Sequence, residues 1–261
     1  MSYLLVCLVA LLASGLTLFS GFGLGTLLLP AFSLFFPVEI AVSATAVVHL
    51  INSLFKLLLV GSKADPRAVL TLGVPAIPGA VAGAWVLTYL SDLPELVSYD
   101  LLGRPASVTG VKLVVAVLIA GFALLELRST GGRLPTGSGY LLVGGLAMGF
   151  FGGLSGHQGG LRSAFLIRYG LSKEAFIGTG VACAVLVDIS RLAVYGWAFL
   201  AIESGLDGRV HGPLILAATA AALTGAWIGV RLMDKVSLTS VHRLVRALLL
   251  ALALGLALGV I

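Results

Sequence analysis

Apolar residues form long runs along almost the whole chain, and the polar residues stand between these runs. The runs cover residues 2–36, 40–61, 68–90, 107–127, 139–154, 175–201, 212–232 and 244–261. Each run is near or above the roughly 18 residues that an α-helix needs to cross a bilayer. Backbone groups in lipid must bond within their own segment, and the runs do not alternate as barrel strands do. We therefore expect the spanning segments to be helical.

Composition agrees with this pattern. Of the 261 residues, 59% are hydrophobic and only 10% are charged, whereas soluble domains carry roughly 25% charged residues. The fold class is therefore all-α, a polytopic helical membrane protein whose partner is the lipid bilayer. The net charge of +5 comes from single basic residues at the ends of the runs, which is typical of topology signals and indicates no nucleic-acid binding. The two cysteines lie in apolar runs, and we predict neither a metal site nor a cofactor.

Two of the runs contain clusters of glycine that predict interrupted helices. Residues 2–36 as one helix would be about 52 Å long, well beyond a hydrocarbon core of about 30 Å. The glycines at 21–25 are the natural break, and a second cluster at 152–160 interrupts the segment 139–169. We expect each broken segment to form a hairpin or a re-entrant pair of helices.

The chain also matches itself at a shift of 135 residues, without a gap. The matched pairs are Gly21 with Gly156, Gly25 with Gly160, Glu39 with Glu174, Lys56 with Arg191 and Gly61 with Gly196. A later Gly-Ala-Trp at 83–85 has a counterpart at 225–227. The pattern predicts two copies of one membrane unit, at 1–127 and 139–261, joined by the stretch 128–138.

The basic residues predict how the chain is oriented, because Lys and Arg favour cytoplasmic loops. If both broken segments fold back, one side collects Lys63, Arg67, Arg128, Arg133, Arg168, Lys173, Arg231, Lys235, Arg243 and Arg246. Only Arg104 and Arg209 fall in loops on the other side. We therefore place the stretch 128–138 in the cytoplasm and both termini outside the cell (inner) membrane, with the halves related by inversion.

A helix that restarts inside the membrane directs free N–H groups and the positive end of its dipole at the break, which suits an anion. The alternative is that the glycines only permit close helix packing. The candidate substrate-binding residues are Gly21, Gly23, Gly25, Thr26, Asn52, Ser155, Gly156, His157, Gln158, Gly159, Gly160, Arg162 and Ser163. The expected partner is a small anionic substrate, and a homo-oligomer stays open.

Charged residues within the runs are functional candidates because they are costly in lipid. Arg162 follows the second break directly, so we expect it to face the anion. Asp188 is the only acid well inside a run, and we offer it, with His157, as a carrier of protons. Arg191 stands three residues after Asp188, so an ion pair within the helix is its alternative, and Lys56 has snorkelling to the interface as its alternative. For His49 we expect a hydrogen bond between helices.

The first break, with Gly21, Gly23, Gly25 and Pro30, resembles the glycine-rich motif of the sulfite exporter TauE/SafE family, also called toluene-sulfonate uptake-type membrane transporters. The resemblance extends through 41–61 and 225–258. The second copy departs from the family pattern, with Arg162 near the place of a proline. The resemblance implies a carrier without ATP that moves sulfite, an organosulfonate or a related sulfur oxyanion by alternating access.

Two other functions compete with this interpretation. The first is an anion channel, since some channels are also built from inverted copies. The second is an intramembrane serine protease, because the stretch 153–156 matches a Gly-x-Ser-Gly motif around Ser155. Such a protease needs a histidine on a later membrane helix, and His211 and His242 fall in or beside loops. We therefore expect no enzyme.

Overall fold

The computed structural model describes residues 2–20, 24–101, 104–128, 138–202, 208–232 and 238–260. The helices are α1 (Ser2–Ser20), α2 (Leu24–Ser33), α3 (Val38–Val60), η1 (Gly61–Lys63), α4 (Pro66–Ala68), the π-helical turn η2 (Val69–Gly73), α5 (Val74–Ser91), α6 (Gly110–Arg128), α7 (Ser138–Ser155), α8 (Gly159–Tyr169), α9 (Lys173–Ile202), α10 (Gly208–Leu232) and α11 (Leu238–Ala257). A single strand pair, β1 (Val97–Leu101) with β2 (Arg104–Val108), interrupts this series in the described chain.

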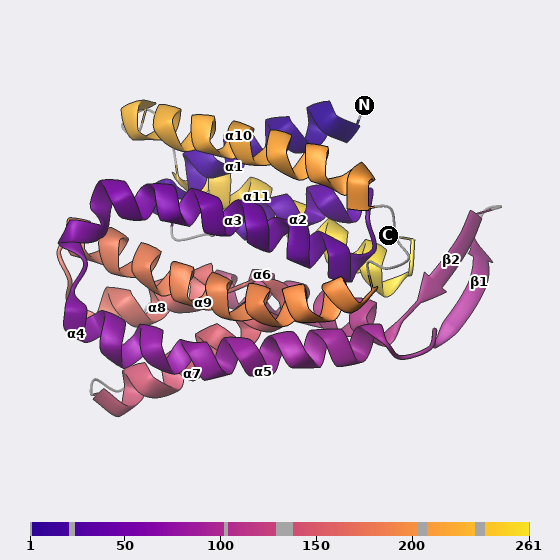
Figure 1. Ribbon diagram of the computed structural model, residues 1–261, viewed down its shortest axis with the longest axis horizontal. Helices are drawn as coiled ribbons and strands as arrows, with labels where there is room; N and C mark the ends of the chain where they lie inside the picture. Colours follow the sequence, from indigo (N-terminus) through magenta and orange to yellow (C-terminus); the bar gives the residue numbers. More distant parts are fainter. Residues whose placement is uncertain are drawn as a thin grey trace.

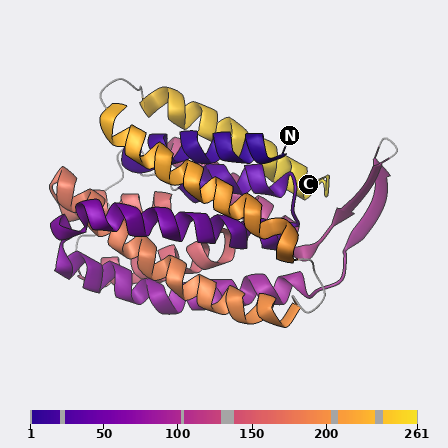
Figure 2. The same ribbon diagram turned by 45° about the horizontal axis from the view of Figure 1, so that its top comes forward.

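The long helices lie side by side along one direction, so that the bundle has two ends (Figure 1). One end carries the strand pair and both chain termini, and we call it the strand end. The other end carries η1 and α4, the end of α8 and the start of α9, and we call it the η1 end (Figures 1 and 2).

Both glycine-broken segments fold back on themselves. The rings of Tyr140 on α7 and Phe165 on α8 have centroids 4.5 Å apart, so the end of α8 returns to the start of α7. The pair α7 and α8 opens at the η1 end, whereas α1 begins and α2 finishes at the strand end (Figures 1 and 2). The fold-back that the basic residues predict is therefore present, in opposite directions in the two segments. The division into repeats at 1–127 and 139–261, and the relation between them, stay predictions; residues 129–137 of the joining stretch lie outside the described residues.

Small residues let helices from distant parts of the chain come into backbone contact. A Cβ on Gly83 of α5 would lie 2.0 Å from the carbonyl oxygen of Phe150, and a Cβ on Gly149 of α7 would lie 2.0 Å from that of Ala76. Both distances are shorter than any real contact, so only glycine allows α5 and α7 to pack so closely. This crossing joins the first part of the chain to the second.

The two Gly-Ala-Trp copies have matching surroundings. Gly83 packs on Phe150 of α7, and a Cβ on Gly225 of α10 would lie 2.0 Å from the carbonyl oxygen of Leu11 on α1. Gly83 thus meets α7 and Gly225 meets α1, and the tryptophan of each copy is exposed. The two-copy interpretation of the sequence stays a prediction.

The bundle exposes large apolar side chains and buries its few polar ones within a largely apolar core, as suits a protein whose solvent is lipid. Leu58 on α3 is 87% exposed and Leu216 on α10 is 71% exposed. Among the described residues, three helices are long and apolar enough to cross a membrane: Val38–Lys63, Pro66–Ser91 and Lys173–Gly196. Shorter apolar helices cover Leu4–Gly15, Gly110–Leu124, Gly139–Ser155 and Gly212–Ile228. The chain is an all-α polytopic membrane protein, as its sequence predicts.

The strand pair was not predicted, since we expected a loop around Arg104. Its register places Val97 opposite Val108, and it is held to the C-terminal end by a bond from the Ser107 amide to the Gly259 carbonyl at 3.1 Å. The signal was present in the alternation of apolar and polar residues at 97–101, which is typical of a strand. A search for long apolar runs overlooks such a short period-two pattern.

Candidate functional site

The two breaks meet inside the bundle. A Cβ placed on Gly25, in the first turn of α2, would lie 3.6 Å from the carbonyl oxygen of Gly156 and 3.4 Å from Cγ2 of Thr45 on α3. Gly156 has a φ of 79°, a left-handed conformation that favours glycine and turns the chain from α7 into α8. The two segments that the sequence singles out as interrupted therefore adjoin each other.

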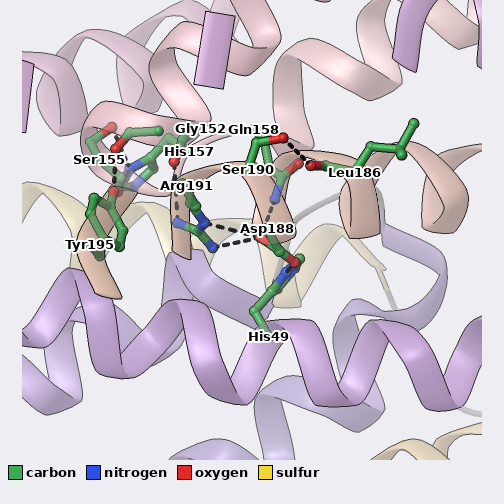
Figure 3. Close-up of polar contacts among 11 residues, drawn as sticks. His49, Gly152, Ser155, His157, Gln158, Leu186, Asp188, Ser190, Arg191 and Tyr195 are labelled. Atoms are coloured by element: carbon green, nitrogen blue, oxygen red, sulfur yellow. Dashed lines mark hydrogen bonds and ion pairs between the residues drawn. The ribbon is translucent and has the colours of Figure 1, made fainter. Parts of the chain in front are cut away.

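Asp188 is the centre of a buried polar network beside this meeting point (Figure 3). Its Oδ2 accepts a hydrogen bond from Nδ1 of His49 on α3 at 2.5 Å, and its Oδ1 accepts one from Nε2 of Gln158 at 2.9 Å. Arg191, one turn further along α9, donates to the same Oδ1 from Nε at 3.1 Å and from Nη2 at 2.7 Å. The hydrogen bond between helices expected for His49 and the ion pair offered as the alternative for Arg191 are both confirmed.

The same part of α9 holds the end of α7. Arg191 donates from Nη1 to the carbonyl oxygen of Gly152 at 3.2 Å, and the Tyr195 hydroxyl donates to the carbonyl oxygen of Gly153. The last carbonyls of a helix have no partner within the helix, so a helix that ends inside a membrane needs such donors. Tyr195 was missed, although it stands four residues after Arg191 and therefore on the same face of α9.

His157 lies in the break with its ring fixed on two sides. Its Nδ1 is 2.9 Å from the carbonyl oxygen of Ser155 and 3.2 Å from that residue's Oγ, and its ring stacks on Phe122 of α6 at a centroid distance of 6.0 Å. The Ser155 hydroxyl donates to the carbonyl oxygen of Phe151 at 3.1 Å. The serine thus directs its proton at a helix carbonyl and not at a base, so this geometry gives no support to a serine nucleophile.

Two further cations lie close to the break. Lys56 on α3 is only 8% exposed. Arg162 begins the second turn of α8, its Nη1 is buried without a hydrogen bond to any described residue, and a Cβ on Gly180 would lie 3.3 Å from its Nε. When both are protonated, Lys56 and Arg162 are near enough to repel each other. Asp188 also attracts Arg162 but already pairs with Arg191, so the described cations around the break outnumber the described carboxylates.

The structure describes fewer candidate residues at the first break than at the second. Gly21 and Gly23 lie outside the described residues, and so does the side chain of Thr26. Asn52 on α3 is buried, and its Oδ1 accepts a hydrogen bond of 2.9 Å from the hydroxyl of Ser14 on α1. Asn52 therefore joins α3 to the helix that precedes the first break.

The remaining candidates belong to the start of α8. Gly159 and Gly160 form its first turn, and a Cβ on Gly160 would meet nothing within 4 Å. Ser163, one residue after Arg162, has an interaction partner of its own. Thr45, next to Gly25, was not a candidate; its Oγ1 is buried and has no hydrogen bond to the described residues.

A pocket of about 480 Å³ lies away from the break, at the strand end. Ser33 lines it from the end of α2 and Glu39 from the start of α3, and Glu95 and Lys112 also line it. Hydrogen bonds from the hydroxyls of Ser98 and Ser107 lower the pKa of the Glu95 carboxyl. Within the described ranges no group of histidine, cysteine and carboxylate side chains could hold a metal ion.

A polytopic helical bundle with two interrupted helices around a buried charged cluster is the architecture of a membrane transport protein. Comparison with known protein families supports the class of membrane transport proteins and identifies one family within it. Residues 6–256 match the family described as sulfite exporter TauE/SafE, and the chain belongs to this family of membrane transporters. The resemblance noted at the first break is thereby confirmed over nearly the whole chain. A comparison with curated proteins gave no match.

Proposed function

We propose that the chain is a secondary carrier for a small anion, namely sulfite, an organosulfonate or a related sulfur oxyanion. The observation that carries this proposal is the cluster of cationic side chains beside the meeting breaks, where buried Lys56 and partly buried Arg162 have no carboxylate of their own among the described residues. A buried unpaired cation is strongly destabilising, and an anion between these two side chains would compensate both. The amides in the first turn of α8 add the positive end of a helix dipole.

Alternating access follows from the way the broken segments are arranged. The pair α1 and α2 opens at the strand end and the pair α7 and α8 opens at the η1 end, so that the two pairs face opposite ends of the bundle (Figure 1). The bond between His49 and Asp188 joins α3 to α9 beside the breaks. We propose that this bond changes during the cycle and that Asp188 couples anion movement to protons. An Asp188→Asn variant that keeps full coupling to a pH gradient would remove Asp188 from this role.

The test is uptake of labelled sulfite into proteoliposomes. Arg162→Gln and Lys56→Met should each lower uptake about ten- to hundredfold, the effect of losing one charge-assisted hydrogen bond in a buried site. Lys63→Gln is the matched control, because Lys63 is an exposed cation on η1 and should leave uptake unchanged. Equal uptake by all variants would contradict the proposed site.

The same vesicles separate a carrier from a channel. A carrier shows saturable counterflow of labelled sulfite against unlabelled sulfite, whereas a channel conducts currents far above carrier rates. We expect counterflow, because the described part of the break is closely packed, with Gly25 beside Gly156. Large sulfite currents without counterflow would replace the carrier by the channel.

A further inference from the structure

The break contains a hydrogen-bond acceptor on Gln158 that nothing in the described structure uses. The amide Nε2 of Gln158 donates to Asp188, and because a carboxylate only accepts, the orientation of this amide is fixed. Its Oε1 must therefore face away from Asp188. Gln158 is 1% exposed, and its Oε1 is buried without a hydrogen bond to any residue that the structure describes.

The neighbouring residue presents a second acceptor. Nδ1 of His157 lies 2.9 Å from the carbonyl oxygen of Ser155, and a carbonyl only accepts, so Nδ1 carries a proton. A neutral imidazole has one N–H, which leaves Nε2 as a bare acceptor. This Nε2 is buried and has no hydrogen bond to the described residues. Stacking on Phe122 holds the ring in place, so the two nitrogens do not exchange freely.

Two unsatisfied buried acceptors in consecutive residues are unusual, since each costs about 1–3 kcal/mol. Both belong to the turn between α7 and α8, and Arg162, which begins the next helical turn, offers an unsatisfied donor. An anion that has only oxygens on its surface would satisfy Arg162 but neither acceptor. A guest that lay against this turn and carried an O–H or N–H group beside its negative oxygens would offer partners to all three groups.

We infer that the anion accepted at this site carries a hydrogen-bond donor of its own, a hydroxyl or an amino group, and that His157 and Gln158 select for it. The inference rests on the proposed function and deepens it, because it names the form of the anion that binds. Hydrogen sulfite and hydroxy- or amino-substituted sulfonates belong to this class. Sulfonates with plain alkyl groups do not.

Matched ligands test the inference by isothermal titration calorimetry on the full-length protein in detergent. One set is ethanesulfonate, 2-hydroxyethanesulfonate and 2-aminoethanesulfonate; the other is methanesulfonate and hydrogen sulfite, at a mildly acidic pH at which hydrogen sulfite predominates. We expect a donor-bearing member to bind at least about tenfold more tightly than the donor-free member of its set. The first set also distinguishes a hydroxyl donor from an amino donor. Equal affinities within both sets would overturn the inference and indicate that water satisfies the acceptors.

Variants connect the preference to the two residues. His157→Phe keeps a ring over Phe122 but removes Nε2, and Gln158→Met keeps the volume but removes Oε1; each should lower the preference at least about fivefold. Arg162→Gln should weaken donor-bearing and donor-free anions by the same factor. A preference that survives in both His157→Phe and Gln158→Met overturns the inference while the anion site stands. If none of the five compounds binds the wild-type protein, the proposed function fails and the inference fails with it.

Discussion

Asp188 is the residue at which distant parts of the chain are joined. Its two carboxylate oxygens accept hydrogen bonds from α3, from the turn before α8 and from its own helix α9. Both Asp188 and Arg191 are completely buried, so the pair has exchanged hydration for these bonds. In such a site, removing one partner costs more than removing both, because the remaining charge is left uncompensated.

The first prediction concerns this buried pair. Asp188→Asn should lower the free energy of unfolding by about 3–5 kcal/mol, because Arg191 would remain buried without a carboxylate. Unfolding by denaturant in detergent micelles measures the loss. Ser190→Ala is the control on the same helix; within the described residues its hydroxyl bonds to the Leu186 carbonyl four residues earlier, so the change should stay within about 1 kcal/mol.

A double substitution separates the charge from the packing. Asp188→Leu combined with Arg191→Met removes both buried charges and should recover most of the stability lost in Asp188→Asn. If the single variant is as stable as Ser190→Ala, the network contributes little to folding. If the double variant is less stable than the single one, the bonds to α3 and α7 outweigh the charge effect.

Sequence spacing predicted some of these residues and could not predict others. The ion pair of Asp188 with Arg191 follows from their separation of three residues on one helix, and the position of Arg162 beside the break follows from its place after the glycines. The partner of Asp188 on α3 is 139 residues away, so spacing alone could not pair it with His49. Phe122 and Thr45 gave no signal, because their contacts with the breaks depend on how separate helices pack.

At the scale of elements, α5 and α7 join the two parts of the chain, because glycines let their backbones come into direct contact. Gly149 faces the carbonyl of Ala76, and Gly153, one turn later, would bring a Cβ to 2.2 Å from that of Ala80. Glycines four residues apart form a groove along one face of α7, into which α5 fits. Gly153 belongs to the glycine cluster at 152–160, for which packing and ligand binding were the two alternatives, whereas Gly149 lies before that cluster. Gly149 and Gly153 serve packing, whereas Gly25 and Gly156 belong to the meeting of the breaks.

The second prediction uses this crossing. Gly149→Ala should destabilise the protein by about 1–3 kcal/mol, because the added methyl group cannot fit against a backbone oxygen and must push the helices apart. Gly121→Ala on α6 is the matched control, since a Cβ there meets nothing within 4 Å. It should leave stability unchanged or raise it by up to about 1 kcal/mol through its better helix propensity. Thermal unfolding of both variants compares them; equal melting temperatures would show that the crossing can open at little cost.

At the scale of the whole molecule, the bundle sorts its connections between two ends. η1 and α4, which carry Lys63 and Arg67, lie at the η1 end, together with the start of α9, whose first residue is Lys173 (Figure 1). The strand pair and both termini lie at the other end. The fold-back topology predicts that Lys63, Arg67 and Lys173 lie on one side of the membrane, and the structure has them at one end of the bundle. The positive-inside rule makes the η1 end cytoplasmic, and this sidedness stays a prediction.

The third prediction tests the sidedness. Single cysteines at Ser62 in η1 and at Ser98 in β1, both exposed, should react with a membrane-impermeant maleimide from opposite sides of the membrane. Ser98→Cys should react in intact cells, and Ser62→Cys should react only after the cells are opened. The native Cys7 and Cys183 are replaced by serine in the background, since both are free thiols. Reaction of Ser62→Cys in intact cells, with protection of Ser98→Cys, would reverse the orientation.

The sequence by itself determined that the chain is a helical membrane protein, where its helices break and which charges lie inside it, because the cost of placing backbone and charge in lipid acts on each segment separately. It also carried the family resemblance in local motifs. Only the tertiary structure decided that Gly25 meets Gly156, that Asp188 bonds to His49, and which glycines pack and which face the breaks. These relations join residues that are far apart in the chain, and the packing of separate helices fixes them.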